Sequence, residues 1–505
     1  MASKILSAAL IGIEAALVEI EASLGGGDFG QIAIVGLPDT SVGEAKERVR
    51  SAIINSGWEF PKRKITVNLA PAELKKMGPS YDLPIALSII ALKYKLKHDL
   101  ASSLFVGELS LSGDVRPIRG AVAIASETKR LGLKKLFLPT ENFAEAALVE
   151  GLEIFPISNL RDLVEHLAGK NQLKTPSSKD KNCVNTQENA EKIINLNEIK
   201  GQAQAKRALA IAVAGGHNLL FHGPPGCGKT SLAQAAAGLL PPLSAEEKLE
   251  LRKIYSLVSS GNDTYQLKRP FRAPHHQASA AALTGGGQRF QPGEVTLAHL
   301  GILFLDELPE FSRPALESLR QPLESGRIVI NRAGFNLILP ARFILIAAMN
   351  PCPCGFKGAR GHDCCCSPEK INNYRRKISG PLLDRIDLQV EVENISYSEL
   401  TDETTLINSS LINQAIIKAR EHQKRRLASL KYPLNSYLSS QAIKSFCPLE
   451  KDGQKLLQTA TNRLNLSNRS YFKILKIART IADLEEQEQI QACHVAEALH
   501  YRLRS

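Results

Sequence analysis

A glycine-rich segment over residues 223–230 carries the clearest chemical signal in this chain of 505 residues. It reads Gly-Pro-Pro-Gly-Cys-Gly-Lys-Thr and fits the phosphate-binding pattern G-x-x-x-x-G-K-[ST]. In this pattern backbone N–H groups surround the phosphates, the lysine neutralises the β and γ oxygens, and the threonine hydroxyl reaches Mg²⁺. An apolar strand over 217–222 and a helix over 231–237 are expected on either side, which disfavours a plain glycine-rich turn. The residues predicted to bind ATP are Gly223, Pro224, Pro225, Gly226, Cys227, Gly228, Lys229, Thr230 and Ser231.

Two carboxylates follow a second apolar run, over residues 302–305. A carboxylate at the tip of a strand can hold the Mg²⁺ shell while its neighbour polarises an attacking water. We therefore predict Asp306, with Thr230, as the Mg²⁺ residues and Glu307 as the catalytic base. The alternative is an ordinary acidic helix start, because Asp and Glu favour the first turn of a helix.

The composition is that of a folded, basic chain. Its length and its 44% hydrophobic content predict roughly three domains with ample cores. The formal charge of +12 permits a polyanionic partner, although many basic proteins bind none. Residues 4–13 superficially resemble a signal peptide, but acidic residues interrupt the pattern from Glu14 onward and no later run approaches a membrane span. We expect a cytoplasmic protein without a membrane partner.

A polar stretch without apolar periodicity divides the chain and predicts a linker over 169–192. Before it, short strands such as 31–35 and 64–69 alternate with helices such as 41–56, which indicates an α/β domain over 1–168. After it we expect an α/β ATPase core over 193–395 and a helical lid over 396–505. The strongest helical periods in the lid span 411–430 and 471–486.

Three further residues extend the ATP site by resemblance. Asn350 ends a third apolar strand, and this order of motifs is similar to the AAA+ ATPases, in which such an Asn is sensor 1. Pro381-Leu-Leu-Asp-Arg385-Ile-Asp resembles the segment that carries the arginine finger, and Arg469 stands where sensor 2 begins the lid helix. A finger acts on ATP in the neighbouring subunit, so the resemblance implies a ring. The alternatives are a structural salt bridge for Arg385 and an ordinary exposed charge for Arg469.

The segments from Gly293 to Leu308 and from Ser379 to Asp387, with Asn-Pro-Cys-Pro-Cys-Gly at 350–355 between them, resemble the magnesium-chelatase-like AAA+ family. The ComM/YifB group is the most similar, over essentially the whole chain. That resemblance implies a homo-hexameric DNA helicase for branch migration in recombination and natural transformation. Its expected partners are single-stranded or branched DNA and proteins of the recombinase pathway. The rival interpretations are a metal-chelatase motor and a protein remodeller.

Two insertions are the candidate DNA contacts. Residues 272–287 resemble the helix-2 insertion of the family, and residues 327–339 read as a hairpin before sensor 1. Arg289 and Arg332 are the predicted phosphate contacts, because a loop cation can hold a DNA backbone without reading its sequence. Solvated loop charges are an equally weighted alternative, as they are for the basic helix 418–426. We expect His275 and His276 to belong to a structural loop.

Five of the nine cysteines lie between residues 352 and 366. Cys352, Cys354, Cys364 and Cys366 fit a C-x-C-G…C-x-C pattern and are predicted to hold a structural Zn²⁺, leaving Cys365 as a spare thiol. The alternative is a set of reduced thiols without metal, and His362 is a possible substitute ligand. A metal knuckle here would brace the strand that ends at Asn350.

The amino-terminal domain resembles the ribosomal-S5-like α+β fold of the Lon protease domain. Ser80 occupies the place of the Lon nucleophile, but Val122 stands where the catalytic lysine belongs. An aliphatic side chain cannot accept the serine proton. We therefore predict no peptidase activity, and a role in assembly or substrate docking.

Overall fold

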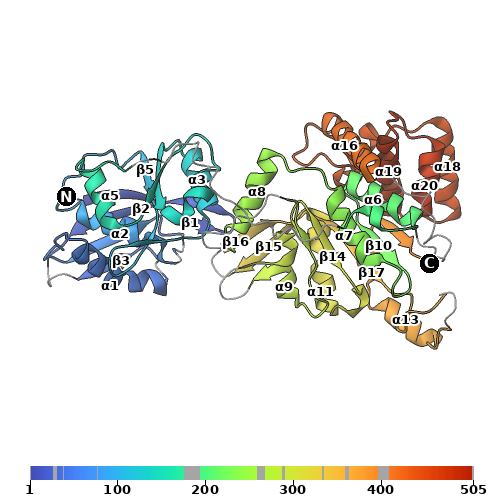
Figure 1. Cartoon of the computed structure of the whole chain (residues 1–505), viewed down its shortest axis with the longest axis horizontal. Helices are drawn as coiled ribbons and strands as arrows, with labels where there is room; N and C mark the ends of the chain where they lie inside the picture. Colours follow the sequence, from blue (N-terminus) through green and yellow to red (C-terminus); the bar gives the residue numbers. More distant parts are fainter. Residues whose placement is uncertain are drawn as a thin grey trace. The chain divides into compact units, whose positions relative to one another are not determined.

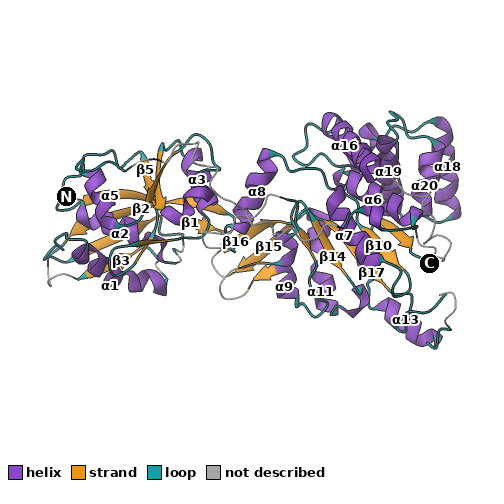
Figure 2. Cartoon of the chain, viewed as in Figure 1, coloured by secondary structure: helices purple, strands orange, loops and turns teal. Residues whose placement is uncertain are grey.

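The computed structural model describes residues 2–26, 31–37, 39–74, 76, 78–173, 175, 194–258, 268–286, 291–332, 335–358, 363–395 and 409–502. The chain forms two compact units (Figures 1 and 2). The first contains residues 1–188 and 244–266, and the second contains residues 189–243 and 267–505. None of the helices in the described part of the chain combines the length and apolar character that crossing a bilayer requires.

The first unit is built on a seven-stranded mixed sheet in the order β3-β4-β2-β1-β5-β8-β9. Strands β1–β2 and β2–β4 pair antiparallel, and the other neighbours pair parallel. The strands are β1 (Ala2–Ile11), β2 (Glu14–Leu24), β3 (Ile32–Val35), β4 (Ile65–Ala70), β5 (Ser103–Phe105), β8 (Lys135–Pro139) and β9 (Glu153–Ile157), beside the short ribbon β6 (Glu108–Leu109) and β7 (Val115–Arg116). In β4 the alternate residues Ile65, Val67 and Leu69 are buried, as expected for a strand with one face on the core.

Helices complete this unit. They are α1 (Thr40–Asn55), α2 (Asp82–Ile90), α3 (Ala121–Arg130), α4 (Phe143–Ala146) and α5 (Leu160–Leu167), with the 3₁₀ turns η1 (Pro79–Tyr81) and η2 (Thr140–Asn142). Every residue of α2 is buried, so this helix is the centre of the unit. The strands predicted near 31–35 and 64–69 and the helix predicted over 41–56 are confirmed. The resemblance to the Lon and S5 folds stays a prediction.

One helix reaches this unit from a distant part of the sequence. Helix α8 (Ala245–Tyr255) lies within the predicted ATPase range of 193–395, yet it packs in the first unit. Leu249 packs against the apolar cluster under α3, and the Ser256 carbonyl accepts a hydrogen bond of 3.0 Å from the Gly120 N–H. The short connection from the phosphate-binding helix at Leu239 to α8 therefore joins the two units covalently a second time.

The second unit contains a five-stranded sheet in the order β11-β14-β17-β10-β18, and every neighbouring pair is parallel. Its strands are β11 (Phe271–Arg272), β14 (Ile302–Leu305), β17 (Ile344–Met349), β10 (Leu219–His222) and β18 (Leu388–Glu391). All residues of β10, β14 and β17 are buried, which is typical of central parallel strands covered on both faces. Because parallel strands share one carboxyl edge, the residues that follow them meet there.

Helices, two ribbons and the carboxy-terminal bundle surround this sheet (Figure 1). The helices beside the sheet are α6 (Ala203–Gly215), α7 (Lys229–Leu239), α9 (Ala280–Thr284), α10 (Glu294–Leu297), α11 (Arg313–Ser318), α12 (Arg320–Ser325), α13 (Pro368–Arg376) and α14 (Gly380–Leu383), with 3₁₀ turns η4 (Leu196–Glu198) and η5 (Leu308–Glu310). The ribbons are β12 (Gly285–Gly286) with β13 (Gln291–Pro292), and β15 (Arg327–Arg332) with β16 (Phe335–Pro340). The antiparallel β15–β16 pair confirms the predicted hairpin.

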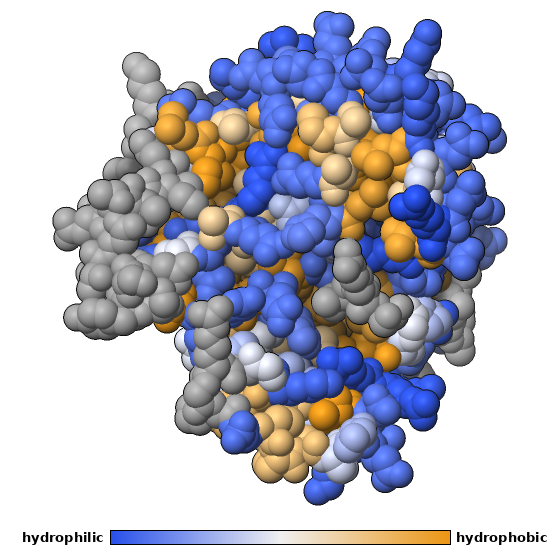
Figure 3. Space-filling model, turned by 90° about the vertical axis from the view of Figure 1, so that its right-hand side faces the viewer, coloured by the Kyte–Doolittle hydropathy of each residue, from blue (hydrophilic) through white to orange (hydrophobic). Residues whose placement is uncertain are grey.

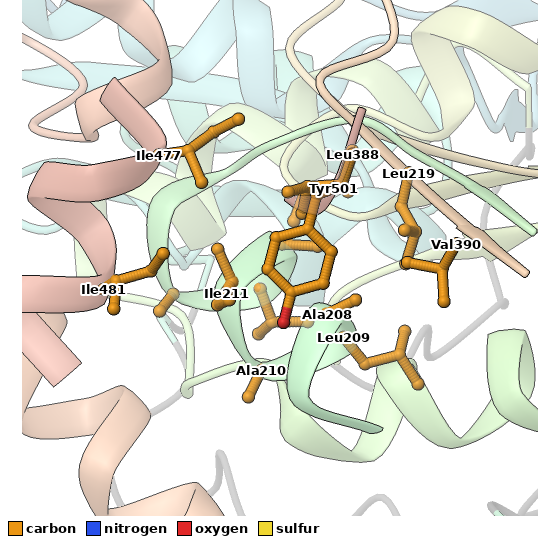
Figure 4. Packing of buried hydrophobic residues seen from close by; sticks show 14 of the residues in the cluster. Ala208, Leu209, Ala210, Ile211, Leu219, Leu388, Val390, Ile477, Ile481 and Tyr501 are labelled. Atoms are coloured by element: carbon orange, nitrogen blue, oxygen red, sulfur yellow. The ribbon is translucent and has the colours of Figure 1, made fainter. Parts of the chain in front are cut away.

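The carboxy-terminal part is helical, with α16 (Ser409–Arg426), α17 (Ser440–Phe446), α18 (Lys451–Arg463), α19 (Asn468–Leu484) and α20 (Ala492–His500), and the turn η6 (Asn435–Tyr437). Figure 4 shows how it shares a core with the sheet: the Tyr501 ring lies among side chains of α6, β10 and β18, with Ile477 and Ile481 of α19 nearby. Polar side chains cover most of the face shown in Figure 3, with apolar side chains between them.

Candidate active site

The phosphate-binding loop connects the end of β10 to the start of α7. Gly226 and Gly228 have φ angles of 80° and 89°, a region that residues with a Cβ rarely adopt. At Gly223 a Cβ would lie 2.1 Å from the Val392 carbonyl oxygen, so the close approach of the neighbouring strand also requires glycine. The loop thereby places the first N–H groups of α7 where an anion can bind.

Side chains from three strand ends meet at this loop. The Lys229 ammonium donates to the carbonyls of Gly223 and Pro224, both at 2.7 Å, and lies 3.3 Å from Asn350 Oδ1. The Thr230 hydroxyl donates to Asp306 Oδ2 at 2.9 Å. A hydroxyl and a carboxylate at this separation form the oxygen donor set that Mg²⁺ prefers. The structure thus brings the predicted Lys229, Thr230, Asp306 and Asn350 together.

Glu307 adopts a left-handed backbone conformation with φ of 51°, and its N–H donates to Asp306 Oδ1 at 2.9 Å. Its side chain is about half exposed, and its Oε2 lies 3.5 Å from His276 Nδ1. The Gln277 N–H donates to Nδ1 of His275 at 3.3 Å. The loop that we expected to be structural therefore contacts the predicted base through His276.

His222, at the end of β10, lies directly before the loop and is buried. Burial, together with the positive charges of Arg375, Lys229 and Lys357, lowers its pKa to about 4. The imidazole is therefore neutral at physiological pH. Cys227 within the loop is also buried and belongs to the core.

The four predicted thiol ligands converge. The sulfur atoms of Cys352, Cys354, Cys364 and Cys366 all lie within 4.8 Å of one another. A hydrogen bond from the backbone N–H of Phe356 is the main factor that lowers the pKa of Cys354 to about 6, so this thiol is readily ionised. Four thiols in this arrangement fit a tetrahedral Zn²⁺ site. Cys365 is exposed, and His362 lies outside the described residues.

The cysteine cluster also touches the phosphate-binding loop. Gly355 has a φ angle of 86°, and a Cβ at this position would lie 2.8 Å from Cδ of Pro225. The Lys357 N–H donates to the sulfur of Cys352 at 3.4 Å. The knuckle is therefore packed against the ATP loop as well as continuing the strand that ends at Asn350.

The two predicted arginines line a different cavity, of about 440 Å³. Arg385 forms an ion pair with Glu324 and its side chain is 8% exposed. Arg469 is exposed at the start of α19, where the Ser467 side chain caps the helix. The described residues of the phosphate-binding loop do not line this cavity.

The predicted DNA contacts are not defined by the structure. Arg289 lies outside the described residues, and for Arg332 only the backbone, at the end of β15, is described. In the basic helix, by contrast, Arg420 donates to the Val213 carbonyl and Lys418 pairs with Glu486.

Sequence families described by the ChlI subunit of magnesium chelatase match three successive parts of the chain. "Subunit ChlI of Mg-chelatase" matches residues 18–142, "Magnesium chelatase, subunit ChlI" matches 195–400, and "Magnesium chelatase, subunit ChlI C-terminal" matches 407–502. An uncharacterized YifB protein from Salmonella typhimurium is 44% identical over 98% of this chain and 96% of its own. The competence protein ComM from Haemophilus influenzae is 44% identical over 99% of this chain and 97% of its own. The chain belongs to the magnesium-chelatase-like ComM/YifB family.

Family membership confirms the resemblance drawn from the sequence and makes this ComM/YifB protein an AAA+-type ATPase that uses ATP and Mg²⁺. A magnesium-chelatase 38 kDa subunit from Cereibacter sphaeroides is 29% identical over 30% of this chain and 51% of its own length. The pairwise match to this chelatase subunit thus covers a part of the chain, whereas the matches to ComM and YifB cover nearly all of it.

The sequence did not predict the contacts of two residues in the second unit of this ComM/YifB protein. One is His276, whose only sequence signal was a histidine pair in an insertion close to the acidic strand. The other is Arg342, whose guanidinium lies 4.4 Å and 4.6 Å from the ring centres of Tyr432 and Tyr437. Because Arg342 follows β16, this stacking joins the base of the hairpin to the helical part.

In the amino-terminal unit, Ser80 lies in η1 and Val122 is fully buried in an apolar cluster. The neighbouring carboxyl of Asp82 forms two hydrogen bonds with Arg48, at 2.9 and 3.2 Å. Burial nevertheless raises the pKa of Asp82 to about 6. Val122 offers no group that could accept a proton from Ser80, so the absence of peptidase activity stays our prediction.

Proposed function

We propose that this protein is an ATP-hydrolysing ring motor on DNA, a hexameric branch-migration helicase in recombination and natural transformation. The ATP-hydrolysis part of this proposal rests on one observation: four side chains meet at one edge of a parallel sheet, those of Lys229, Thr230, Asp306 and Asn350. The DNA half is supported by the full-length similarity to the competence protein ComM and by the basic charge of +12. A cytoplasmic location is part of the same proposal.

The residues of the site divide the work of hydrolysis. The N–H groups of the loop hold the phosphates, and Lys229 exchanges its carbonyl partners for the β and γ oxygens. Thr230 and Asp306 hold the Mg²⁺, which when bound neutralises charge on the phosphates. Glu307 accepts a proton from the attacking water, and Asn350 orients the γ-phosphate.

Hydrolysis is completed between subunits in this proposal. Arg385 acts as the finger on ATP held by a neighbouring subunit, and Arg469 supports the same phosphate as sensor 2. Support for a shared role is that both line one cavity, in which basic side chains outnumber acidic ones. Arg289 and Arg332 are the proposed contacts with the phosphate backbone of DNA. Proteins of the recombinase pathway are the proposed partners that help to load the ring onto DNA.

Zinc has a structural role in the proposal. Cys352, Cys354, Cys364 and Cys366 hold Zn²⁺, which fixes the knuckle beside Pro225 and the strand that ends at Asn350. The metal takes no part in hydrolysis.

A second candidate is a chelatase-like or protein-remodelling ATPase without DNA motor activity. The specific observation in its favour is that all three family matches are described by the ChlI subunit. The amino-terminal unit would then dock a protein partner. The two candidates differ in what stimulates ATP hydrolysis: DNA in the first, and a protein in the second.

The test is ATP-dependent migration of a labelled branched or three-stranded DNA junction. We expect migration by the wild type and none by Lys229→Ala, which loses the phosphate charge, or by Glu307→Gln, which binds ATP without hydrolysing it. Glu310→Gln is the matched control, because Glu310 lies on the same turn but pairs with Lys377. ATP turnover that is intact, unresponsive to DNA and without junction movement would reject the DNA motor and favour the second candidate.

A further inference from the structure

Arg385 is held in a covered ion pair rather than presented to another molecule. Its Nη2 pairs with the Glu324 carboxylate at the end of α12, and its Nη1 donates to the Pro381 carbonyl at 2.8 Å. Its side chain is 8% exposed, whereas that of Glu324 is 59% exposed. The Asn218 amide donates to the Arg385 carbonyl at 2.9 Å and fixes the backbone from the start of β10. The backbone and the guanidinium of Arg385 are therefore both fixed by hydrogen bonds, and the exposed Glu324 carboxylate pairs with the guanidinium.

The surroundings of this pair suit a stronger anion than a carboxylate. The cavity of about 440 Å³ is lined by more basic than acidic side chains: Arg342, Arg385, Arg469, Lys473 and Lys476, against Glu324, Asp384 and Asp387. Hydrogen bonding to Arg385, with Arg469 and Arg320 nearby, holds the pKa of Glu324 below its usual range, so Glu324 is charged. The Nε–H of Arg385 is buried and has no acceptor among the described residues. A phosphate group offers further oxygens to the guanidinium fork and carries more charge than Glu324.

We propose that Glu324 is a positioning residue that keeps Arg385 withdrawn until a phosphate of ATP bound to a second copy of this chain displaces it. The inference rests on the proposed function, in which Arg385 acts on the neighbouring subunit's nucleotide. One guanidinium cannot keep its full ion pair with Glu324 while it engages a phosphate, so the two contacts compete. Hydrolysis in the neighbouring subunit is thereby restrained until its bound phosphate has displaced Glu324 from Arg385.

Displacement of Glu324 from Arg385 also affects the β15–β16 hairpin, which begins directly after α12. Glu324 is followed by Ser325, whose hydroxyl bonds the carbonyls of Gln321 at 2.9 Å and Arg327 at 3.0 Å. A Cβ at Gly326 would lie 2.8 Å from the Arg342 side chain, so this turn is closely packed. Release of Glu324 frees the end of α12 where it joins β15. Nucleotide in one subunit can thus alter the base of the hairpin in its neighbour.

The experiment is steady-state ATP hydrolysis by the full-length assembled protein. Glu324→Gln keeps the size of the side chain but removes its charge, and we expect kcat to rise roughly three- to tenfold. KM for ATP should stay the same or fall, because Glu324 competes with the phosphate for Arg385 and does not contact the phosphate-binding loop in the described structure. Glu324→Asp, which keeps the charge, is expected to restore values close to wild type. Glu486→Gln, which removes the exposed pair with Lys418, is the matched control and leaves kcat unchanged.

Arg385→Ala separates this inference from the proposed function. If Arg385→Ala abolishes hydrolysis and Glu324→Gln leaves kcat at the wild-type value, the proposed restraint by Glu324 is refuted, and the assignment of Arg385 as the arginine finger is retained. If Arg385→Ala hydrolyses ATP normally, the assignment of Arg385 as the finger fails, and the inference fails with it. The proposal requires that the double variant, with Glu324→Gln and Arg385→Ala together, have the same kcat as Arg385→Ala alone. A folded Glu324→Asp with kcat raised as far as Glu324→Gln would also refute the role of the charge.

Discussion

The contact between the cysteine knuckle and the phosphate-binding loop predicts a specific coupling between Gly355 and ATP binding. Gly355→Ala adds one methyl group at a φ angle of 86°, 2.8 Å from Cδ and 3.1 Å from Cγ of Pro225. The left-handed backbone costs alanine about 1–2 kcal/mol. The overlap with the rigid proline ring costs a further 1–3 kcal/mol, roughly, as in other overpacked sites.

The chain supplies its own control. Gly358 lies in the same knuckle with a φ angle of 79°, but a Cβ there meets nothing within 4 Å among the described residues. Gly358→Ala should therefore lower the free energy of unfolding by about 1–2 kcal/mol, and Gly355→Ala by about 2–5 kcal/mol. If Pro225 moves instead and relieves the overlap, the same 1–3 kcal/mol appears as ATP affinity that is weaker by roughly 5- to 150-fold.

Two measurements decide between these outcomes: denaturant unfolding of both variants, and titration of each with a fluorescent ATP analogue. The coupling requires that Gly355→Ala lose more unfolding free energy, or more affinity for the ATP analogue, than Gly358→Ala. Equal unfolding free energies together with equal nucleotide affinities would refute the contact between the knuckle and the loop.

Three further predictions concern other parts of the second unit. Wild-type protein should contain stoichiometric zinc by elemental analysis, Cys352→Ser should lose it, and a chelator should lower the melting temperature of the wild type only. The pKa of His222 is about 4 in the folded protein against an ordinary value of 6.5, so the unfolded chain takes up the proton first and stability is lost as pH falls from 6.5 towards 4. Wild type should therefore lose about 2 kcal/mol more unfolding free energy than His222→Gln between pH 7 and pH 5, measured in urea. Arg342→Lys, which keeps the charge but not the planar stacking on Tyr432 and Tyr437, should lower the unfolding free energy by about 1 kcal/mol in the same assay.

Local patterns predicted the strands and loops of the ATPase sheet well. The apolar runs before Asp306 and Asn350 were recognisable because central strands of a parallel sheet are buried on both faces and read as continuous hydrophobic segments. The hairpin over 327–340 and the helices near 411–430 and 471–486 followed from the same kind of periodicity. The boundaries differ by a few residues, because helix and strand ends depend on caps and neighbours.

Contacts between segments that are distant in the chain could not be predicted from the sequence. Nothing in the sequence indicated that α8, which lies between the phosphate-binding loop and Asp306, would pack beneath α3 of the first unit. Its packing there depends on residues far away in the chain, which no local pattern reveals. The contact of His276 with Glu307 has the same origin, since it depends on how the loop after β11 turns.

By itself the sequence determined that this chain has a phosphate-binding loop, acidic and Asn-tipped strands, and four cysteines at the spacing of a metal knuckle, because each depends on neighbouring residue types and on short-range backbone geometry. The tertiary structure decided that the knuckle packs on Pro225, that Arg342 lies between two tyrosines, and that Arg385 is paired with Glu324. These contacts join segments that are far apart in the chain. Their geometry follows from packing of the whole unit, in which the same arginine has several possible partners and only the fold selects one.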